Sequence, residues 1–382
     1  MLALDSAAAL RAMGIETRVF APDLAVGANA SRYWTVSPEE LAKLPAHARV
    51  FRTRRPRRLV FSPALYAALG REAGDYDVVH IHNLWTFPQF AAYRQASRHR
   101  VPFVVAPCGA LDPLRRQRSR RAKALTNALW QQRMLAEARL IHFKTRAEAE
   151  RASDLVPPEK GVIVPNGIRW QSFQQLADGV AFRRQHLEGH TGAVVMTIGR
   201  ISWEKRLDLL IRAFAHVAVE SPEAILVIAG PDDEGLREGL ERLARELGIG
   251  PRVRFIGALL GDERLAALAS ADIWCLSSEF ENFGLAAVEA LAAGLPAVVT
   301  EGVQLASEIG AAGAALVAAR TPEALATDMR RLLHDARLRR ELSERGRAFA
   351  RAFDWTSIAP KLASMYHRAA AGDGARGRGR SV

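Results

Sequence analysis

The chain has 382 residues, of which 49% are apolar and 25% are charged, a balance typical of a globular protein with two domains. No apolar run is long enough to span a membrane, which takes about 18 residues. The first residues, with an early Asp5 and no basic region, do not resemble a signal peptide. Cys108 and Cys275 lack the spacing of metal ligands, which favours a reducing cytoplasm and argues against a disulfide framework.

The net charge of +12 is confined to the N-terminal part of the chain. Residues 1–165 hold 26 Lys and Arg against 14 Asp and Glu, whereas residues 166–382 hold 27 of each. No nucleic-acid-binding module accompanies this charge, so nucleic acid is not an expected partner. An anionic membrane surface, an acidic acceptor and a merely solvated face remain open. The excess is densest in two blocks: Arg52, Arg54, Arg55, Arg57, Arg58, and Arg115, Arg116, Arg118, Arg120, Arg121, Lys123.

The chain begins with a predicted helix over residues 2–13, which Gly14 ends, and a predicted strand follows over residues 17–20. A Rossmann-like sheet normally begins with a strand and a glycine-rich turn before its first helix. Because both are absent here, we expect the natural gene to start upstream and to add roughly 15–30 residues. The 382-residue chain is then expected to express poorly or to lack activity.

Short apolar runs alternate with longer amphipathic stretches from there on, a pattern that predicts parallel α/β sheets. The first series of runs lies at residues 75–85, 101–111, 138–145 and 162–168. A second series lies at residues 193–200, 224–230, 253–257, 271–277 and 295–300, with a clear helix at 207–220. We therefore predict two Rossmann-like domains, residues 1–168 and 191–352. The polar, non-periodic residues 169–190 are interpreted as the linker between them.

The end of the chain divides into two parts. Residues 353–370 have the pattern of a helix, with Asp354 and Thr356 near its start. Residues 371–382 are rich in glycine and arginine and have no apolar periodicity, so we predict a disordered tail.

The sharpest chemical signal lies in residues 277–299, where a strand passes into a helix. Backbone N–H groups at a helix start attract phosphate oxygens, and Gly284 permits close approach of a ligand. On a continuous helix, Glu281 and Glu289 would lie roughly 12 Å apart along the axis. That separation suits the two ends of one polyhydroxylated ligand and exceeds that of a glycosidase pair. Two solvated acids remain the alternative. The residues at the strand-to-helix transition are Glu281, Asn282, Phe283, Gly284 and Leu285.

A second signal lies in residues 198–214, where a strand ends at Gly199 and a helix follows. Arg200 and Lys205 are placed in the loop between them. Such a loop can hold both cations over a diphosphate, Arg as a bidentate donor and Lys as a point charge. Ordinary surface charge near a helix start is the alternative.

In the N-terminal half, His80 and His82 lie on one face of a predicted strand. No third ligand at metal spacing accompanies them, so no metal site is expected. We interpret His80 as a satisfied core imidazole, and His82 either as structural or as an acceptor contact, together with Asn83. The turn at Cys108 and Gly109 should open onto the same crevice. A nucleophilic Cys108 is disfavoured because no base or orienting group can be placed beside it.

Taken in order, these motifs resemble the retaining glycosyltransferases of family 4, also called group 1, which have the two-domain GT-B fold. The resemblance covers nearly the whole chain and is strongest in GRISWEKRLDLLIRAF, in LVIAGPDDEG, and from VRFIGALLGDERLAALASADIWCLSSEFENFGLAAVEALAAGLPAVV onward. VVHIHNLW and VVAPCGALDP resemble the acceptor half of members that build bacterial surface polysaccharides. The C-terminal helix would cross back to the N-terminal domain.

The resemblance also implies roles for individual residues. Arg200 and Lys205 would hold the donor diphosphate, Glu281 would contact the donor sugar and Glu289 the ribose. The backbone of Asn282–Leu285 would bind sugar hydroxyls and phosphate. The segment around Ile256 and Gly257 would lie near the nucleobase. On the acceptor side, His82, Asn83, Cys108 and Gly109 are the candidate contacts, although many relatives have histidine near the place of Cys108.

These features together predict a cytoplasmic, metal-independent and cofactor-free enzyme, placed at the inner face of the membrane if its basic half binds anionic lipid. It would transfer a sugar from a nucleotide sugar to a lipid-linked or saccharide acceptor, in the cleft between its domains. Arg200, Lys205 and Glu281 would be the catalytic residues, with both cations exposed before the donor binds. An epimerase or phosphorylase on the same fold, or an inactive truncated binding protein, are the alternatives.

Overall fold

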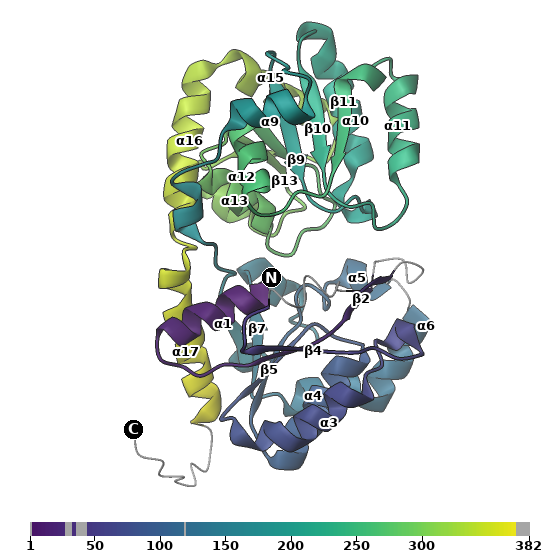
Figure 1. Ribbon diagram of the computed structural model, residues 1–382, viewed down its shortest axis with the longest axis vertical. Coiled ribbons are helices and arrows are strands. Elements are labelled where there is room, and N and C mark those ends of the chain that lie inside the picture. Colours follow the sequence, from purple (N-terminus) through teal and green to yellow (C-terminus); the bar gives the residue numbers. More distant parts are fainter. Residues whose placement is uncertain (1, 27–32, 36–43, 118–119, 372–382) are drawn as a thin grey trace. The chain divides into compact units, whose positions relative to one another are not determined.

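The computed structural model describes residues 2–26, 33–35, 44–117 and 120–371, which form two compact units (Figure 1). One unit combines Met1–Gly167 with Thr356–Val382, and the other comprises Ile168–Trp355. The second unit is therefore inserted in sequence between two parts of the first. No helix in the described ranges has both the length and the apolar character that crossing a membrane requires.

The inserted unit is built on a six-stranded parallel sheet whose four inner strands are fully buried apolar runs, whereas the two edge strands are partly exposed. Its spatial order is β11-β10-β9-β12-β13-β14. Numbered within the unit, this is the order 3-2-1-4-5-6 of a doubly wound sheet, whose direction of winding reverses between β9 and β12. The strands are β9 (Val194–Ile198), β10 (Ile225–Ala229), β11 (Val253–Gly257), β12 (Ile273–Leu276), β13 (Ala297–Thr300) and β14 (Leu316–Ala318).

Helices cover both faces of this sheet because alternate strand residues point to opposite sides. Met196 of β9 packs with one apolar cluster and Val195 with the other. The first cluster includes side chains of α9 (Gly179–His186), α12 (Gly261–Ser270), α13 (Leu285–Ala292), α14 (Ala306–Ala311) and the end of α16 (Ala336–Arg351). The second includes those of α10 (Leu207–Glu220), α11 (Arg237–Glu246), α15 (Pro322–His334) and the start of α16.

The predicted linker at residues 169–190 is wrong, because this segment is folded into the inserted unit. It forms the short helix η5 (Trp170–Phe173) and then α9. Phe173, Phe182 and Leu187 are buried in the core. The Arg183 guanidinium also donates 2.8 Å hydrogen bonds to the Ser270 carbonyl and the Asp272 carboxylate. Three widely spaced apolar side chains anchor the segment, too few to produce a visible periodicity.

The first unit contains a four-stranded parallel sheet in the order β5-β6-β7-β8. In the described residues it is not hydrogen-bonded to the parallel pair β1–β4 or to the antiparallel pair β2–β3. The large-sheet strands are β5 (Val79–His82), β6 (Phe103–Ala106), β7 (Leu140–Phe143) and β8 (Gly161–Ile163). The paired strands are β1 (Val19–Pro22), β4 (Ala48–Phe51), β2 (Leu24–Val26) and β3 (Tyr33–Thr35).

The helices of this unit include α1 (Leu2–Ala12), as predicted, and the C-terminal helix α17 (Trp355–Ala370). The helix α17 crosses back to the first unit, where its apolar face is buried and the Tyr366 hydroxyl lies 2.8 Å from His80 Nδ1. Other α-helices in the described part of this unit are α3 (Pro63–Glu72), α4 (Phe87–His99), α5 (Pro113–Gln117), α6 (Arg120–Thr126), α7 (Gln132–Glu137) and α8 (Arg146–Arg151). The predicted tail, apart from residue 371, lies outside the described residues.

Candidate functional site

The candidate site lies at the carboxyl ends of β9 and β12, where the winding of the larger sheet reverses. Ligands of doubly wound sheets bind at this edge because the loops on either side diverge there. Gly199 follows β9, and its N–H donates to the carbonyl of Ala229 at the end of β10. A Cβ atom on Gly230 would lie 1.8 Å from the Gly199 carbonyl oxygen. The loops after β9 and β10 therefore touch, and only glycine allows it at position 230.

The two cations predicted in the loop after β9, Arg200 and Lys205, lie in different environments. Arg200 has a 44% exposed side chain, whose guanidinium lies 3.2 Å from the fully buried carboxylate of Asp233. Lys205 ends the short helix η6 (Trp203–Lys205), and only 15% of its side chain is exposed. The expectation that both cations are exposed is thus wrong for Lys205. Its stem folds back over Gly199, where an added Cβ would lie 3.4 Å from Lys205 Cε.

The Lys205 ammonium forms an ion pair with Glu281, which comes from the loop after β12. Backbone hydrogen bonds hold Glu281 in place, because its N–H donates to Gly302 and its carbonyl accepts from Gln304, each at 3.0 Å. The Ser277 hydroxyl fixes the other partner by donating to the Lys205 carbonyl at 2.8 Å. The structure therefore brings two residues 76 positions apart in sequence into direct contact.

The strand-to-helix transition differs from the prediction in one respect. The helix α13 begins only at Leu285, so Glu281 and Glu289 do not share a helix and the eight-residue helical spacing does not apply. Gly284 precedes the helix with φ of 77°, and a Cβ there would lie 2.9 Å from Val303 Cγ1. Leu285 and the next residue have no intrahelical acceptor for their N–H groups. These donors are available to a ligand.

Asn282 and Phe283 line the same transition. Phe283 is buried, with its ring edge-on to Phe353 at a centroid distance of 5.5 Å. The Oδ1 atom of Asn282 is buried and accepts no hydrogen bond from the residues that the structure describes. An unsatisfied buried acceptor costs about 1–3 kcal/mol. A hydroxyl group of a ligand would satisfy it.

Glu289 is buried on α13, where it is 9% exposed, and it pairs with Arg264 of α12. The guanidinium donates to Glu289 Oε1 at 3.0 Å and contacts Oε2 as well. Burial lowers the pKa of Arg264. Sequence reasoning missed Arg264, although the helical phase of Glu289 predicts burial and a buried carboxylate requires a cation.

The remaining predicted residues on this unit lie at the end of β11. Gly257 has a φ of 77°, and nothing lies within 4 Å of the place its Cβ would take. Its carbonyl accepts a 2.6 Å hydrogen bond from Gly230 N–H, which joins this strand end to the loop after β10. Ile256 is half-buried against the core. These residues therefore border the open edge of the sheet.

The predicted acceptor residues meet at the carboxyl ends of β5 and β6 in the other unit. His82 and Asn83 are exposed, and the Asn83 N–H donates to the Ala106 carbonyl at 2.8 Å. Cys108 and Gly109 both have positive φ angles, 53° and 78°. Burial raises the pKa of the Cys108 thiol, which disfavours the thiolate that a nucleophile requires.

A chain of neutral side chains, which sequence reasoning found only in part, lies beneath these residues. The Tyr366 hydroxyl is 2.8 Å from His80 Nδ1, and His80 Nε2 is 3.3 Å from His142 Nδ1. His142 Nε2 donates to the Val164 carbonyl at 2.8 Å, which leaves its Nδ1 as the acceptor. Burial holds the pKa values of both histidines well below the usual range.

Lys144, the residue after β7, is buried beside this chain, with Nζ 3.2 Å from His142 Nδ1. Burial lowers its pKa. Its backbone N–H and that of Gly109 both donate to the carboxylate of Glu148, at 2.7 and 2.6 Å. Across the described residues, no group of three or more His, Cys, Asp or Glu is placed to hold a metal ion.

Comparisons with known proteins find glycosyl transferase families in both units. The family model described as glycosyl transferases group 1 matches residues 180–349, and a glycosyl transferase 4-like domain matches residues 3–167. D-inositol 3-phosphate glycosyltransferase from Salinispora tropica is 31% identical over 80% of this chain and 67% of that protein. The enzyme of that name from Actinosynnema mirum is 30% identical over 80% and 75%.

Two solved structures show the same fold. HepE from Anabaena, in complex with UDP-glucose, superposes with a TM-score of 0.72 at 20% identity and covers 84% of this chain and 85% of that one. Sucrose-phosphate synthase from Thermosynechococcus elongatus gives a TM-score of 0.72 at 20% identity, with coverage of 95% and 91%.

Proposed function

This chain belongs to the group 1 glycosyltransferases of GT-B fold, and from that premise we propose that it transfers a sugar from a nucleoside diphosphate sugar with retention of anomeric configuration. The observation that carries the proposal is the Lys205–Glu281 ion pair at the reversal of the larger sheet. It places a cation, a carboxylate and the start of α13 at the edge where such sheets bind ligands.

In this proposal Lys205 and Arg200 bind the donor diphosphate. Negative charge grows on the diphosphate as the bond to the sugar breaks, and cations already in position lower the barrier. A diphosphate entering the site would take the Lys205 ammonium from Glu281. The released carboxylate of Glu281 could then accept a hydrogen bond from a sugar hydroxyl. The Arg200 guanidinium, which is more exposed, needs no such exchange.

Asn282 and Glu289 extend the same site toward the rest of the donor. The unsatisfied Oδ1 of Asn282 supports its role as acceptor for a sugar hydroxyl. We assign the ribose hydroxyls to Glu289, whose carboxylate is oriented by Arg264. The open edge around Gly257 is the proposed place of the base. Retention is proposed to proceed with a donor phosphate oxygen taking the acceptor proton, so no side-chain base is assigned.

The acceptor side of the proposal is assigned to the unit that carries the excess positive charge. His82, Asn83, Cys108 and Gly109 are the proposed contacts for a lipid-linked or saccharide acceptor, in surface polysaccharide or glycolipid synthesis. Peripheral contact with the anionic inner face of a membrane is part of this proposal. We also propose that no metal or cofactor takes part, and transfer should then continue unchanged in EDTA.

The test is a transfer assay over a panel of UDP, GDP and ADP sugars, with hydrolysis of the donor followed in the same samples. Lys205→Ala should lower kcat by about 100-fold or more because a preorganised charge is removed. Lys361→Ala, at an exposed position on α17, is the matched control and should keep full activity.

Removing Lys205 also leaves Glu281 without its cation, so loss of folding must be separated from loss of chemistry. The double variant Lys205→Ala/Glu281→Gln carries no unpaired carboxylate and should fold as the parent does, as thermal unfolding would show. It should nevertheless stay inactive. Parental turnover in either variant would refute the assignment of Lys205.

A further inference from the structure

The segment Arg52–Arg58 follows β4 and holds five arginines within seven residues, all of them exposed. Arginines close to it in the fold are paired, since Arg18 and Arg49 both form ion pairs with Glu72. Among the described residues, none of the five in the segment has a carboxylate partner. The segment therefore keeps a concentration of positive charge that no carboxylate in the described part of the chain neutralises.

Backbone and small polar groups hold this segment in one conformation. The Thr53 N–H donates to Asp23 Oδ1 at 2.8 Å, and the Arg54 N–H donates to the Phe61 carbonyl at 2.7 Å. The hydroxyl of the fully buried Ser62 donates to the Arg52 carbonyl at 2.9 Å. None of these bonds uses a guanidinium group. The arginine side chains are thus presented by an ordered loop and are not required to build it.

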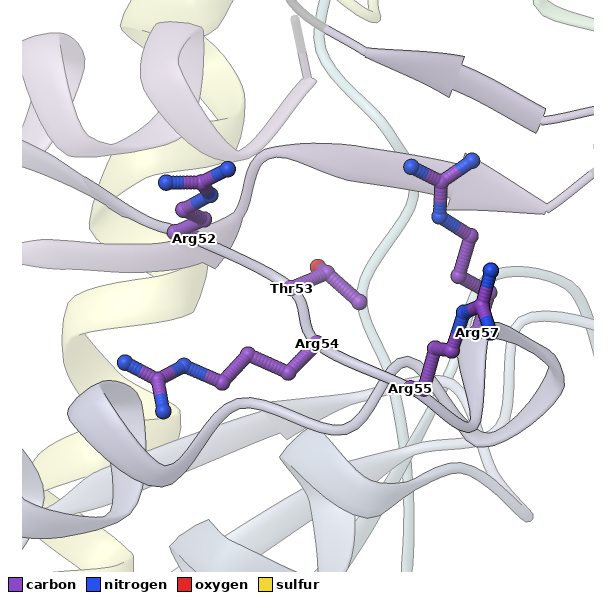
Figure 2. Close-up of a pocket in the computed structure, with 5 residues that line it drawn as sticks. All are labelled: Arg52, Thr53, Arg54, Arg55 and Arg57. Atoms are coloured by element: carbon purple, nitrogen blue, oxygen red, sulfur yellow. The ribbon is translucent and has the colours of Figure 1, made fainter.

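Four of the arginines line a hollow of about 520 Å³, together with Thr53. Figure 2 shows the side chains of Arg52 and Arg54 toward the left of the view and those of Arg55 and Arg57 toward the right. A hollow of this size is within the range that holds small molecules.

We propose that this arginine pocket, residues 52–57, binds a phosphate or diphosphate group carried by the acceptor. The positive charges of neighbouring guanidinium groups repel one another. A ligand that brings several negative charges to one place would lower this repulsion. A carboxylate brings a single charge, whereas a diphosphate brings more, in a geometry that guanidinium groups bind through two parallel hydrogen bonds.

The assignment to the acceptor rests on the proposed function, in which the donor diphosphate is bound by Arg200 and Lys205 of the other unit. A second phosphate site, on the unit assigned to the acceptor, then belongs to the other substrate. A lipid diphosphate and a soluble sugar phosphate share this chemistry. Diffuse attraction to a membrane surface is a different outcome, which the experiment separates.

The experiment titrates inorganic pyrophosphate into the full chain by calorimetry. The parent is Arg200→Ala/Lys205→Ala, in which the donor site has lost both cations proposed to bind its diphosphate. Adding Arg54→Gln/Arg57→Gln should weaken pyrophosphate binding at least tenfold. The matched control adds Arg71→Gln/Arg98→Gln instead, which removes the same charge from exposed, unpaired positions of the same unit and should leave the affinity within twofold.

Equal affinity in the pocket variant, or an equal loss in the control, would overturn the pocket. A second arm measures sedimentation with vesicles of phosphatidylcholine alone or with 30% phosphatidylglycerol, with and without pyrophosphate as competitor. Competition by pyrophosphate supports a lipid-borne source for the phosphate group. Soluble binding with no lipid dependence supports a soluble acceptor. Lipid binding that needs Arg54 and Arg57, without any binding of pyrophosphate, would show a diffuse membrane surface and refute the pocket.

Pyrophosphate binding needs neither donor nor turnover. Its outcome is therefore independent of the transfer assay with Lys205→Ala. An inactive wild-type protein that still binds pyrophosphate through Arg54 and Arg57 would refute the proposed function and keep the pocket. The reverse result would keep the function and refute the pocket.

Discussion

At the scale of single residues, the Glu289 carboxylate on α13 is held by Arg264 of α12. Both side chains are largely buried, and the carboxylate has a bidentate geometry with the guanidinium. A buried carboxylate that loses its cation remains charged in a medium of low polarity. Removing Arg264 alone should therefore lower the free energy of unfolding more than removing both side chains.

We predict that Arg264→Ala lowers the free energy of unfolding by about 3–5 kcal/mol, the usual cost of breaking a buried pair from one side. Arg264→Ala/Glu289→Ala should cost less than the sum of the single changes, with a coupling of about 1–3 kcal/mol. Urea unfolding of the four proteins measures this cycle. Strictly additive losses would mean that the two groups do not interact.

The Tyr366–His80–His142 chain is a residue-scale feature with a pH dependence. Both histidines have pKa values below that of the unfolded chain, near 6.5, because burial disfavours the imidazolium. Between the lowered pKa and 6.5 the unfolded chain binds more protons than the folded one. The free energy of unfolding therefore falls as the pH falls through this window and is fully recovered above it.

Stability should accordingly decline between pH 7 and pH 5, and the decline should be smaller in His142→Gln, which cannot take up a proton. His367→Gln, at an exposed position on α17, is the matched control. The readout is the urea midpoint at each pH, compared between variants so that carboxylates titrating in all of them cancel. If the urea midpoint changed equally with pH in the parent, His142→Gln and His367→Gln, the buried histidines would not be the cause of the decline.

At the scale of elements, the start of α13 depends on one glycine. Gly284 adopts a left-handed backbone conformation that costs other residues about 1–2 kcal/mol. Its missing side chain also leaves room for Val303, which follows β13. Both constraints place the loop that carries Glu281 and Asn282 against the sheet edge.

Gly284→Ala is predicted to lower the free energy of unfolding by at least about 1–2 kcal/mol and to weaken donor binding, because the loop must move. The matched change is Gly239→Ala in the first turn of α11, where nothing lies within 4 Å of an added Cβ. In that variant the free energy of unfolding should rise by roughly 0.5–1 kcal/mol. Thermal unfolding and calorimetric titration with nucleoside diphosphates give both quantities; a neutral Gly284→Ala would show that the conformation is not needed.

Elements with strong local signals were predictable. The helix at 207–220 was predicted with the bounds of α10. The strands β5 to β7 and β9 to β13 lie within the predicted apolar runs, and β8 overlaps the run at 162–168 only at its start. The three-residue strand β14 and the segment before α9 were missed because their stability comes from contacts with distant residues. The candidate site follows the same division. Motif spacing pointed to Lys205 and Glu281, but their contact with each other, and that of Arg200 with Asp233, depend on tertiary structure alone.

At the scale of the whole molecule, the first unit is completed by a helix from the far end of the chain. The helix α17 buries Ile358, Leu362 and Met365 and places Tyr366 against His80. Burial of a large aliphatic side chain is worth about 1.5–3 kcal/mol. Three such side chains together approach the entire stability of an ordinary domain, about 5–15 kcal/mol.

We therefore predict that a chain ending at Trp355 keeps its inserted unit folded and loses the structure of the first unit. Hydrogen exchange followed by mass spectrometry should show fast exchange in β5 to β8 and unchanged protection in β9 to β13. Tyr366→Phe, which removes only the hydroxyl, should leave both units folded. Retained protection of β5 to β8 in the shortened chain would contradict the role of α17.

Because one unit is inserted within the other in sequence, the two parts of the first unit are translated at different times. The ribosome completes residues 1–167 first, yet the helix that covers them is made only after the whole of Ile168–Trp355. At about 5–20 residues per second, this interval is roughly 10–40 s. During that time the inserted unit, which is contiguous in sequence, is being made. Until α17 has been made, the apolar surface of the first unit that α17 covers stays exposed. We expect the protein to depend most on chaperones at this stage.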